Sequence, residues 1–347
     1  MYNLFSLIDR LAEEHSLSKE QYEALIAGRS QSLADYAAQR ADKVRREIYH
    51  NNVYIRGLIE ISSVCRNDCY YCGLRRSNKS CQRYTLTYDQ ILNCCAQGYI
   101  LGFRTFVLQG GEGAVKIDGI CALVKEIKNR YPECAVTLSL GEYSLEHYRR
   151  MLEAGADRYL LRHETADRAH YSLLHPPEMS FDHRMQCLKH LKRLGFQVGC
   201  GFMVGSPYQK AYHIAQDLKF IEEFKPDMCG IGPFIPQKDT PFGNMPPGSA
   251  GLTIYLLSLI RLIQPNILLP ATTALGTIEK DGRLKGILAG ANVVMPNLSP
   301  PAVRDKYAIY DNKLTSGAES AQSLETLKVE IRSIGFNAVQ ARGDIKK

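Results

Sequence analysis

Apolar and polar positions in the first fifty residues follow a helical period, without any strand-like run. Ser18 and Gln21 have the spacing of a capping box and predict the start of a second helix. A third helix is predicted over residues 33–49. We therefore expect an N-terminal helical extension over residues 1–50.

From residue 53 onward the pattern changes to short apolar runs rich in β-branched residues, separated by amphipathic helical stretches. Eight such strand-like runs are predicted, at residues 53–61, 105–109, 135–140, 158–163, 197–204, 228–234, 267–273 and 292–295. Strand followed by helix, repeated eight times, is typical of a (β/α)8 TIM-type barrel. A doubly wound open sheet would give the same alternation and is the alternative.

We place this α/β barrel at residues 51–310. Residues 311–347 are expected to form a C-terminal helical segment packed on the barrel, so that the chain makes one structural domain.

Composition and charge exclude several classes of protein. The chain has 347 residues, 45% of them apolar, and a net charge of +7 that is not gathered into a long basic run. Disorder, a coiled coil and nucleic-acid binding are therefore not expected. No stretch reaches the roughly 18 to 20 uncharged apolar residues that cross a bilayer, and the N-terminus lacks the order of a secretion signal. We expect a cytoplasmic protein without a membrane partner.

Three of the eleven cysteines form a C-x3-C-x2-C cluster, Cys65, Cys69 and Cys72, directly after the first predicted strand. That position is the carboxyl-terminal mouth of a barrel, where active sites lie. Three thiolates on one loop suit zinc or an iron–sulfur cluster. Three ligands leave one metal with an open position.

This motif, with an aromatic residue before the last cysteine, resembles the radical S-adenosylmethionine (SAM) enzymes. The resemblance implies that Cys65, Cys69 and Cys72 ligate a [4Fe-4S] cluster, whose fourth iron chelates SAM. Such a cluster passes one electron to SAM, which then breaks into methionine and a 5'-deoxyadenosyl radical. The electron comes from an external donor.

A second motif, Gln109-Gly110-Gly111-Glu112, follows the second predicted strand. It resembles the segment that radical SAM enzymes set against the methionyl amine of SAM. Glycines let the backbone approach a ligand closely, and a carboxylate or carbonyl can accept from an amine. Two glycines and an acid after a strand are also an ordinary turn, which is the alternative.

The fourth predicted strand carries Arg158, Arg162 and Glu164 on one face by its alternation. One possibility is that Arg162 and Glu164 satisfy each other as an ion pair. The other is that Glu164 contacts the SAM ribose or amine while both arginines face an anionic substrate. Arg184, on the next predicted helix, either forks onto the SAM carboxylate or is an exposed helix arginine.

Longer segments resemble one family, the HydE-type maturases of [FeFe]-hydrogenase. The similar segments lie near almost every predicted strand end: 63–66, 72–76, 137–142, 162–166, 230–236, 270–274 and 295–297. This resemblance implies SAM contacts from Tyr71, Gln109, Glu164 and Arg184. It also implies that the substrate cavity is lined by Thr137, Ser139, Arg158, Arg162, Met228, Thr272, Thr273, Met295 and Tyr307.

The chain departs from that family in three places. It has no cysteine between Tyr310 and Lys347, so we expect no auxiliary C-terminal cluster. Gly110 stands where the family usually has serine. Residues 205–208 read Gly-Ser-Pro-Tyr where the family tends to have Gly-Leu-Pro-Gly.

The resemblance implies a radical SAM enzyme that assembles the hydrogenase diiron subcluster. Its small-molecule or organometallic substrate would be a cysteine-bound iron carbonyl cyanide complex, and other hydrogenase maturases would be partners. The alternatives are a mutase similar to methylornithine synthase and a sulfur-inserting enzyme similar to biotin synthase. The predicted second and third strands lack the cysteines that biotin synthase needs. A non-enzymatic alternative is a zinc site that adds Cys81 to the three cysteines.

Overall fold

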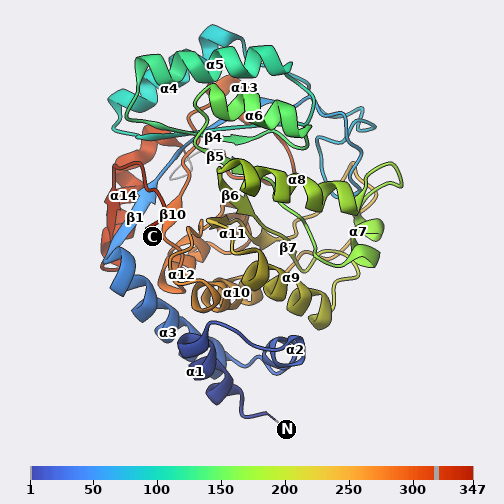
Figure 1. Cartoon of the computed structure of the whole chain (residues 1–347), viewed down its shortest axis with the longest axis vertical. Helices are drawn as coiled ribbons and strands as arrows, with labels where there is room; N and C mark the ends of the chain where they lie inside the picture. Colours follow the sequence, from blue (N-terminus) through green and yellow to red (C-terminus); the bar gives the residue numbers. More distant parts are fainter. Residues whose placement is uncertain (1, 316–319, 347) are drawn as a thin grey trace.

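The computed structural model describes residues 2–315 and 320–346 of the chain. Three helices precede the first strand and lie at the lower end of the molecule in Figure 1. They are α1 (Leu4–Glu14), α2 (Lys19–Ala27) and α3 (Gln31–Tyr49). The predicted capping box is confirmed, because Ser18 and Gln21 each bond the backbone N–H of the other.

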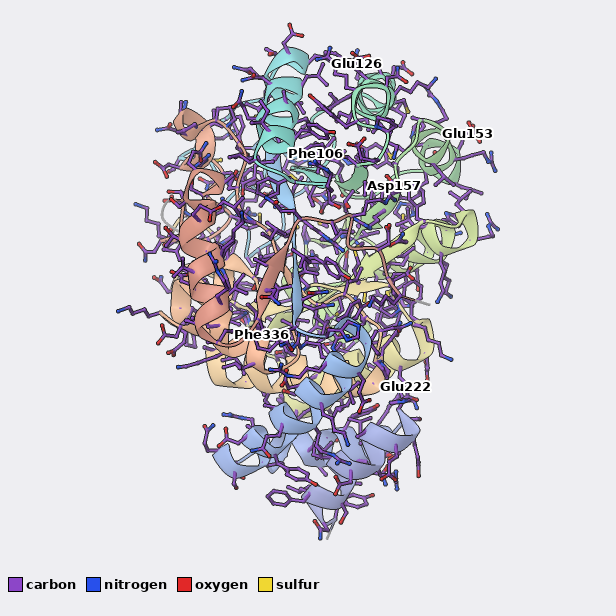
Figure 2. The ribbon with its side chains drawn as sticks, turned by 90° about the vertical axis from the view of Figure 1, so that its left-hand side faces the viewer. Phe106, Glu126, Glu153, Asp157, Glu222 and Phe336 are labelled. Atoms are coloured by element: carbon purple, nitrogen blue, oxygen red, sulfur yellow. The ribbon has the colours of Figure 1, made fainter. Side chains whose placement is uncertain are left out.

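The N-terminal helices are fixed to the outside of the barrel by polar contacts. The Tyr22 hydroxyl donates to Glu222 at 2.7 Å, and the same carboxylate accepts from the Ser16 hydroxyl at 2.7 Å. Figure 2 labels Glu222 where these helices meet the rest of the molecule. This contact joins the extension to helix α9 (Ala211–Phe224).

Parallel strands form the centre of the molecule. Six make one sheet in the order β2-β3-β4-β5-β6-β8: β2 (Gly57–Ser62), β3 (Thr105–Gly110), β4 (Ala135–Ser139), β5 (Arg158–Leu160), β6 (Gln197–Cys200) and β8 (Met228–Cys229). A second sheet has β1 (Asn52–Ile55) between β10 (Val293–Val294) and β11 (Asn337–Val339), and a third pairs β7 (Met203–Val204) with β9 (Gly232–Pro233).

Isolated parallel bridges close these sheets into a ring. They pair Met228 with Leu268, Pro270 with Val293 and Leu58 with Asn297. The ring therefore continues from β8 through residues 268–270 to β10 and returns to β2. The closed barrel is confirmed, and the open sheet is excluded.

The seventh predicted strand is the least regular part of the ring. Residues 267–273 contribute two isolated bridges instead of a continuous ladder. Pro270 has no N–H to donate, which interrupts a ladder at that position.

Helices follow the strands around the outside of the barrel (Figure 1). They are α4 (Tyr88–Ile100), α5 (Ile117–Arg130), α6 (Leu145–Glu153), α7 (Arg168–Leu174), α8 (Phe181–Leu194), α9, α10 (Ala250–Ile263), α11 (Thr273–Ile278), α12 (Gly282–Leu288), α13 (Pro301–Arg304) and α14 (Leu324–Ser333). In the part of the chain that is described, no helix is both long and apolar enough to cross a membrane.

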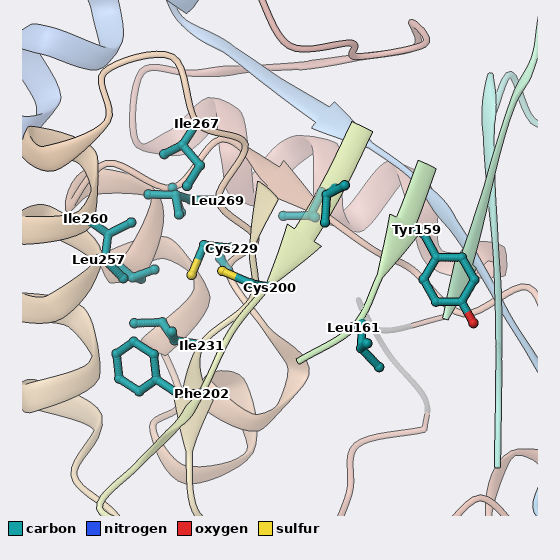
Figure 3. Packing of buried hydrophobic residues seen from close by; sticks show 14 of the residues in the cluster. Tyr159, Leu161, Cys200, Phe202, Cys229, Ile231, Leu257, Ile260, Ile267 and Leu269 are labelled. Atoms are coloured by element: carbon teal, nitrogen blue, oxygen red, sulfur yellow. The ribbon is translucent and has the colours of Figure 1, made fainter. Parts of the chain in front are cut away.

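The main core lies between the barrel and this outer layer. Figure 3 shows Cys200 and Cys229 side by side, facing Leu257 and Ile260 of α10. Both cysteines are fully buried, and they are register partners on β6 and β8. They are apolar packing residues there, as small buried cysteines commonly are.

The C-terminal segment closes the amino-terminal end of the barrel. After β11, which the apolar pattern did not predict, the backbone carbonyl of Arg342 accepts from the hydroxyl of Thr105, the first residue of β3, at 2.7 Å. Gly343 accepts from the Arg56 guanidinium at 3.1 Å. A Cβ on Gly343 would lie 2.7 Å from the Tyr54 ring, so the tail fits tightly beneath the strands.

Candidate active site

The cysteine loop leaves β2 at the carboxyl-terminal mouth of the barrel. Cys65, Cys69 and Cys72 are half-buried there. Burial, together with the negative charge of the Cys65 thiolate, raises the pKa of Cys72 to about 12. Burial and Cys72 likewise raise the pKa of Cys69. The three thiols are therefore close enough to oppose one another's ionisation.

A thiolate set of this kind requires a positive partner, which bound iron supplies by displacing the protons. Among residues 2–315 and 320–346, no group of three His, Cys, Asp or Glu side chains converges closely enough to hold a single metal ion. A cubane instead takes each cysteine on a different iron. The donor set fits the [4Fe-4S] cluster better than the alternative single zinc ion.

Arg83 holds the cysteine loop in shape. Its guanidinium donates to four backbone carbonyls, those of Ser63 at 2.6 Å, Leu74 at 2.8 Å, Arg75 at 2.7 Å and Asn78 at 3.2 Å. These carbonyls lie on both sides of the three cysteines. One side chain therefore fixes both ends of the loop.

Gly111 allows the cysteine loop to lie against the strand β3. Its N–H donates to the Ser62 carbonyl at 3.0 Å, and a Cβ at this position would lie 2.0 Å from the carbonyl oxygen of Val64. Gly110 is the last residue of β3 and pairs in register with Ser62. Close backbone approach is therefore the role that the structure gives to Gly111.

Glu112 connects two loops of the mouth. Its carboxylate accepts from the Arg66 guanidinium at 2.9 and 2.7 Å and from the Glu142 N–H at 2.9 Å. The side chain is only 6% exposed. Both carboxylate oxygens thus have partners within the protein, and the contact of Glu112 with the SAM amine stays a prediction.

Glu164 has an unusual backbone conformation beside the cysteines. Its φ is +65°, and its N–H donates to the Gly201 carbonyl at 3.0 Å. Arg162 Nη2 lies 3.1 Å from Glu164 Oε2. The ion pair that was one of two alternatives is therefore present. A left-handed glutamate persists only where its surroundings enforce it, and such positions cluster at functional sites.

Arg184 reaches from α8 into the same region. It is only 7% exposed, so the alternative of an exposed helix arginine is wrong. Its Nη1 donates to the Arg162 carbonyl at 3.1 Å, and its Nε forms an ion pair with Glu142. Although burial opposes its charge, the Glu142 carboxylate holds the pKa of Arg184 above its usual value. Sequence reasoning did not select Glu142 as a site residue, although it lies inside a segment that resembles the family.

Tyr71 is oriented by a histidine that the sequence analysis missed. The Tyr71 hydroxyl lies 3.1 Å from His175 Nε2. Burial lowers the pKa of His175 to about 3, so the ring is neutral. Its Nδ1 lies 2.9 Å from the Tyr171 carbonyl and must donate there, which leaves Nε2 to accept from Tyr71. Nothing in the spacing of residues around His175 indicates this contact.

Polar side chains line the barrel interior below the mouth. Gln109 and Ser139 are register partners at the carboxyl ends of β3 and β4, and Gln109 Nε2 donates to the Tyr307 hydroxyl at 3.4 Å. The Thr137 hydroxyl is buried and has no hydrogen-bond partner among the described residues. A buried hydroxyl without a partner is costly, and a ligand that bonds it would remove that cost.

A small cavity brings three further predicted residues together. Thr272, Thr273 and Met295 line it, along with Leu58 and Arg283. The Thr272 hydroxyl donates to the Ile231 carbonyl at 3.4 Å. These three positions therefore lie together, and their contact with substrate stays a prediction.

Arg158 lies at the opposite end of the barrel from the cysteines. Its guanidinium donates to Asp344 at 2.5 Å, to the Arg342 carbonyl at 2.9 Å and to the Thr105 hydroxyl at 3.2 Å. Arg158 and Arg162 share a face, but four residues of strand separate them by about 13 Å. The structure does not bring Arg158 to the mouth, because the C-terminal tail occupies its guanidinium.

Met228 is near the same end of the barrel. Its sulfur accepts from the Arg56 guanidinium at 3.1 Å. Arg56 is buried, and it was not selected from the sequence because its contacts come from residues far along the chain.

Comparisons with known proteins identify the family of the chain. The Radical SAM superfamily matches residues 59–221. The [FeFe] hydrogenase maturase subunit HydE of Thermotoga maritima is 43% identical over 303 residues, which cover 87% of this chain and 86% of that protein. The 3-methylornithine synthase of Methanosarcina acetivorans is 27% identical over 309 residues, 88% of this chain and 87% of that protein.

Solved structures show the same fold. The crystal structure of methylornithine synthase (PylB) has a TM-score of 0.85 and 25% identity, covering 96% of this chain and 97% of that one. The crystal structure of HydG, a maturase of the [FeFe]-hydrogenase, has a TM-score of 0.79 and 20% identity, covering 96% of this chain and 75% of that one. The barrel and the identity to the Thermotoga maritima protein together place the chain in the HydE family of radical SAM enzymes.

Proposed function

We propose that this protein acts in maturation of the [FeFe]-hydrogenase diiron subcluster, on a cysteine-bound iron carbonyl cyanide precursor delivered by a partner maturase. The observation that carries the proposal is 43% identity to a HydE protein across 87% of the chain. The reaction would take place in the cytoplasm. All eleven cysteines are unpaired, which suits a reducing compartment.

Cys65, Cys69 and Cys72 would hold the [4Fe-4S] cluster, and Tyr71, Gln109, Gly110, Gly111, Glu164 and Arg184 would surround SAM. When bound, the cluster supplies the electron that breaks a carbon–sulfur bond of SAM and yields a 5'-deoxyadenosyl radical. No auxiliary cluster is part of the proposal, since the chain has no cysteine after Cys229.

The residues of the chain would bind and orient the substrate and exclude water. The Thr137 hydroxyl can donate to an anionic ligand of the precursor, such as cyanide or carboxylate. Arg162 would bring a positive charge to the mouth, where its Nη2 lies 3.1 Å from Glu164 Oε2. The C-terminal tail bonds Thr105 and Arg56 at the other end of the barrel, so the substrate would enter from the mouth.

The decisive experiment uses anaerobically reconstituted protein, SAM, reductant and the synthetic iron carbonyl cyanide cysteine complex. We expect 5'-deoxyadenosine to form faster when the complex is added, and the complex to be consumed in proportion. Deletion of the gene should abolish hydrogenase activity in a host that makes the enzyme. Unchanged 5'-deoxyadenosine formation together with normal hydrogenase activity in the deletion strain would overturn the proposal.

A second candidate function is an amino-acid mutase. It is favoured by the likeness to methylornithine synthase, with a TM-score of 0.85 over 96% of the chain. Incubation with L-lysine in place of the iron complex distinguishes the two, because only a mutase would release methylornithine.

A further inference from the structure

The loop that carries the three cysteines also carries basic side chains that the proposed reaction does not use. Residues 63–83 include five Lys and Arg but only one acid, whereas the whole chain of 347 residues has a net charge of +7. Over half of the excess positive charge of the protein is thus concentrated in this short loop.

Two of these side chains are free to meet a partner. The Arg76 side chain is 62% exposed, and its nearest acid, Glu178, lies 3.7 Å away and is equally exposed. Lys79 is exposed and has no ion pair among the described residues. An exposed ion pair contributes only about 0–1 kcal/mol, so Glu178 would not prevent Arg76 from contacting another acid.

The other three basic side chains already have partners. Arg66 binds Glu112, Arg75 binds Asp68 at 3.0 Å, and Arg83 binds backbone carbonyls. Arg83 has no acidic partner in the described part of the chain, so its positive charge adds to the field of the loop without being available for contact.

The free basic residues lie next to the cysteines. The Arg76 N–H donates at 2.8 Å to the carbonyl of Asn67, which lies between Cys65 and Cys69 in the sequence. Lys79 follows Asn78, whose carbonyl is bound by Arg83 at 3.2 Å. Val64, the residue before Cys65, is 40% exposed. An exposed apolar residue and two exposed cations therefore border the cysteine site.

We propose that this surface, formed by Val64, Arg76 and Lys79 and called here the basic loop surface, docks an acidic one-electron donor protein. The inference rests on the proposed function, which consumes one electron for each SAM cleaved. The donor protein is oxidised by one electron, and that electron reduces SAM as its carbon–sulfur bond breaks. A positive surface beside the redox site attracts an acidic donor and speeds its encounter.

Binding tests the proposal without any activity measurement. Oxidised flavodoxin, an acidic flavoprotein, serves as the probe in calorimetric titrations of the protein at low ionic strength. The double variant Arg76→Glu/Lys79→Glu should bind at least about tenfold more weakly than the wild type. The wild-type affinity should also fall as salt is added.

A matched control changes the same charge elsewhere. Lys19 and Lys43 are exposed residues of α2 and α3, two of the helices that precede the first strand (Figure 1). Lys19→Glu/Lys43→Glu should retain the wild-type affinity. If both double variants bound flavodoxin equally weakly, the net charge of the protein alone would account for binding. That result would overturn the proposal that the basic loop surface docks the donor.

Turnover gives a second readout on the reconstituted protein. The Arg76→Glu/Lys79→Glu variant should form 5'-deoxyadenosine about tenfold more slowly with reduced flavodoxin but at the wild-type rate with dithionite. Repeating both arms with a ferredoxin identifies which donor class binds, and binding by neither overturns the proposal. Failure of the wild type with dithionite would count against the proposed function alone, because the titrations judge docking separately.

Discussion

At the scale of single residues, Arg83 and Glu112 show how the cysteine loop is shaped before any cofactor binds. Arg83 donates hydrogen bonds to four carbonyls of the loop itself, while Glu112 accepts one from the segment after β4. Both side chains are fully engaged by the protein. They act on the cysteines through the backbone, so their loss should affect cofactor loading more than the chemistry of a loaded site.

Replacing Arg83 by alanine should therefore reduce the iron bound per chain after anaerobic reconstitution. We expect a loss of about 1–2 kcal/mol in unfolding free energy, because hydrogen bonds from a charged donor are removed and the carbonyls are partly solvated. Arg83→Lys keeps the charge but cannot reach four acceptors, so it should load nearly as poorly. Arg76→Ala is the control, and full iron content in Arg83→Ala would contradict this role.

The cysteines and the loop that carries them could be predicted from the sequence because their spacing is local. His175 and Glu142 could not, since each becomes a site residue only through a partner brought close by folding. Arg158 has the right residue type on the right face of its strand. Its position along the strand, and the tail residue Asp344 that binds it, place its guanidinium at the amino-terminal end of the barrel, and its contact with substrate stays a prediction.

At the scale of elements, residues 305–315 cross the mouth after α13. The Gly73 N–H, in the cysteine loop, donates to the Ile309 carbonyl at 3.0 Å. Farther along, the Asp311 N–H donates to the Pro236 carbonyl at 3.1 Å. Lys313 then forms a buried ion pair of 2.6 Å with Glu60 of β2. This segment thereby connects three separate parts of the barrel rim.

Lys313→Met should destabilise the protein by about 3–5 kcal/mol, because it leaves Glu60 buried without its cation. Burial already raises the pKa of Glu60 in the wild type, although Lys313 and Asn297 oppose the shift. A carboxyl whose pKa is higher in the folded state than in the unfolded state binds more protons when folded. The free energy of unfolding therefore falls as the pH rises above about 4.3, the pKa of an unperturbed glutamate.

As the pH rises above about 4.3, the free energy of unfolding of Lys313→Met, measured in urea, should fall more steeply than that of the wild type. The double variant Lys313→Met/Glu60→Gln should recover part of the loss, since no buried charge remains. If the free energy of unfolding of Lys313→Met did not change over this pH range, the role given to the Glu60–Lys313 ion pair would be wrong.

The prediction of strands failed where a proline interrupts the hydrogen-bond ladder and where a strand is too short to show an alternation of apolar and polar residues. Residues 267–273 have the composition of a strand, but Pro270 cannot donate to a ladder. Strand β11 has three residues, which is too short for a period to be visible, and it forms because β1 offers a free edge. The alternation of strand and helix could be predicted because it repeats from residue 53 onward, but the closure of the sheet into a barrel could not be read from that alternation, which also fits an open sheet.

At the scale of the whole molecule, the C-terminal tail joins the end of the chain to the first strands of the barrel. Asp344 binds the fully buried Arg158 and also Gln197, and Arg342 binds Asp157, which Figure 2 labels. Phe336, ahead of this tail, stacks under the Arg45 guanidinium of α3 at 4.0 Å. The barrel therefore depends on residues far from it in sequence.

Asp344→Asn should lower the unfolding free energy by about 2 kcal/mol, because Arg158 stays buried with a weaker partner while Asp344 is itself part-exposed. Hydrogen bonds and the nearby arginines hold the pKa of Asp344 below its usual value. Its contribution is therefore complete above about pH 4 and is lost as the pH falls below that. Urea titrations at pH 7 and pH 3 should show a smaller wild-type advantage at pH 3. Glu325→Gln, in an exposed pair with Lys328, is the matched control.

Because some cysteines are buried and others are partly exposed, alkylation can measure how many protein molecules carry iron and sulfide at the cysteine motif. Six of the eleven are buried, and the five that are partly exposed are Cys65, Cys69, Cys72, Cys81 and Cys121. Treatment of the folded apoprotein with iodoacetamide should therefore add carbamidomethyl groups, counted by mass spectrometry, to these five cysteines, and most slowly to Cys69 and Cys72, whose raised pKa keeps them protonated. Once iron and sulfide occupy the motif, only Cys81 and Cys121 should remain open to alkylation, so the mass of the labelled chain reports occupancy molecule by molecule.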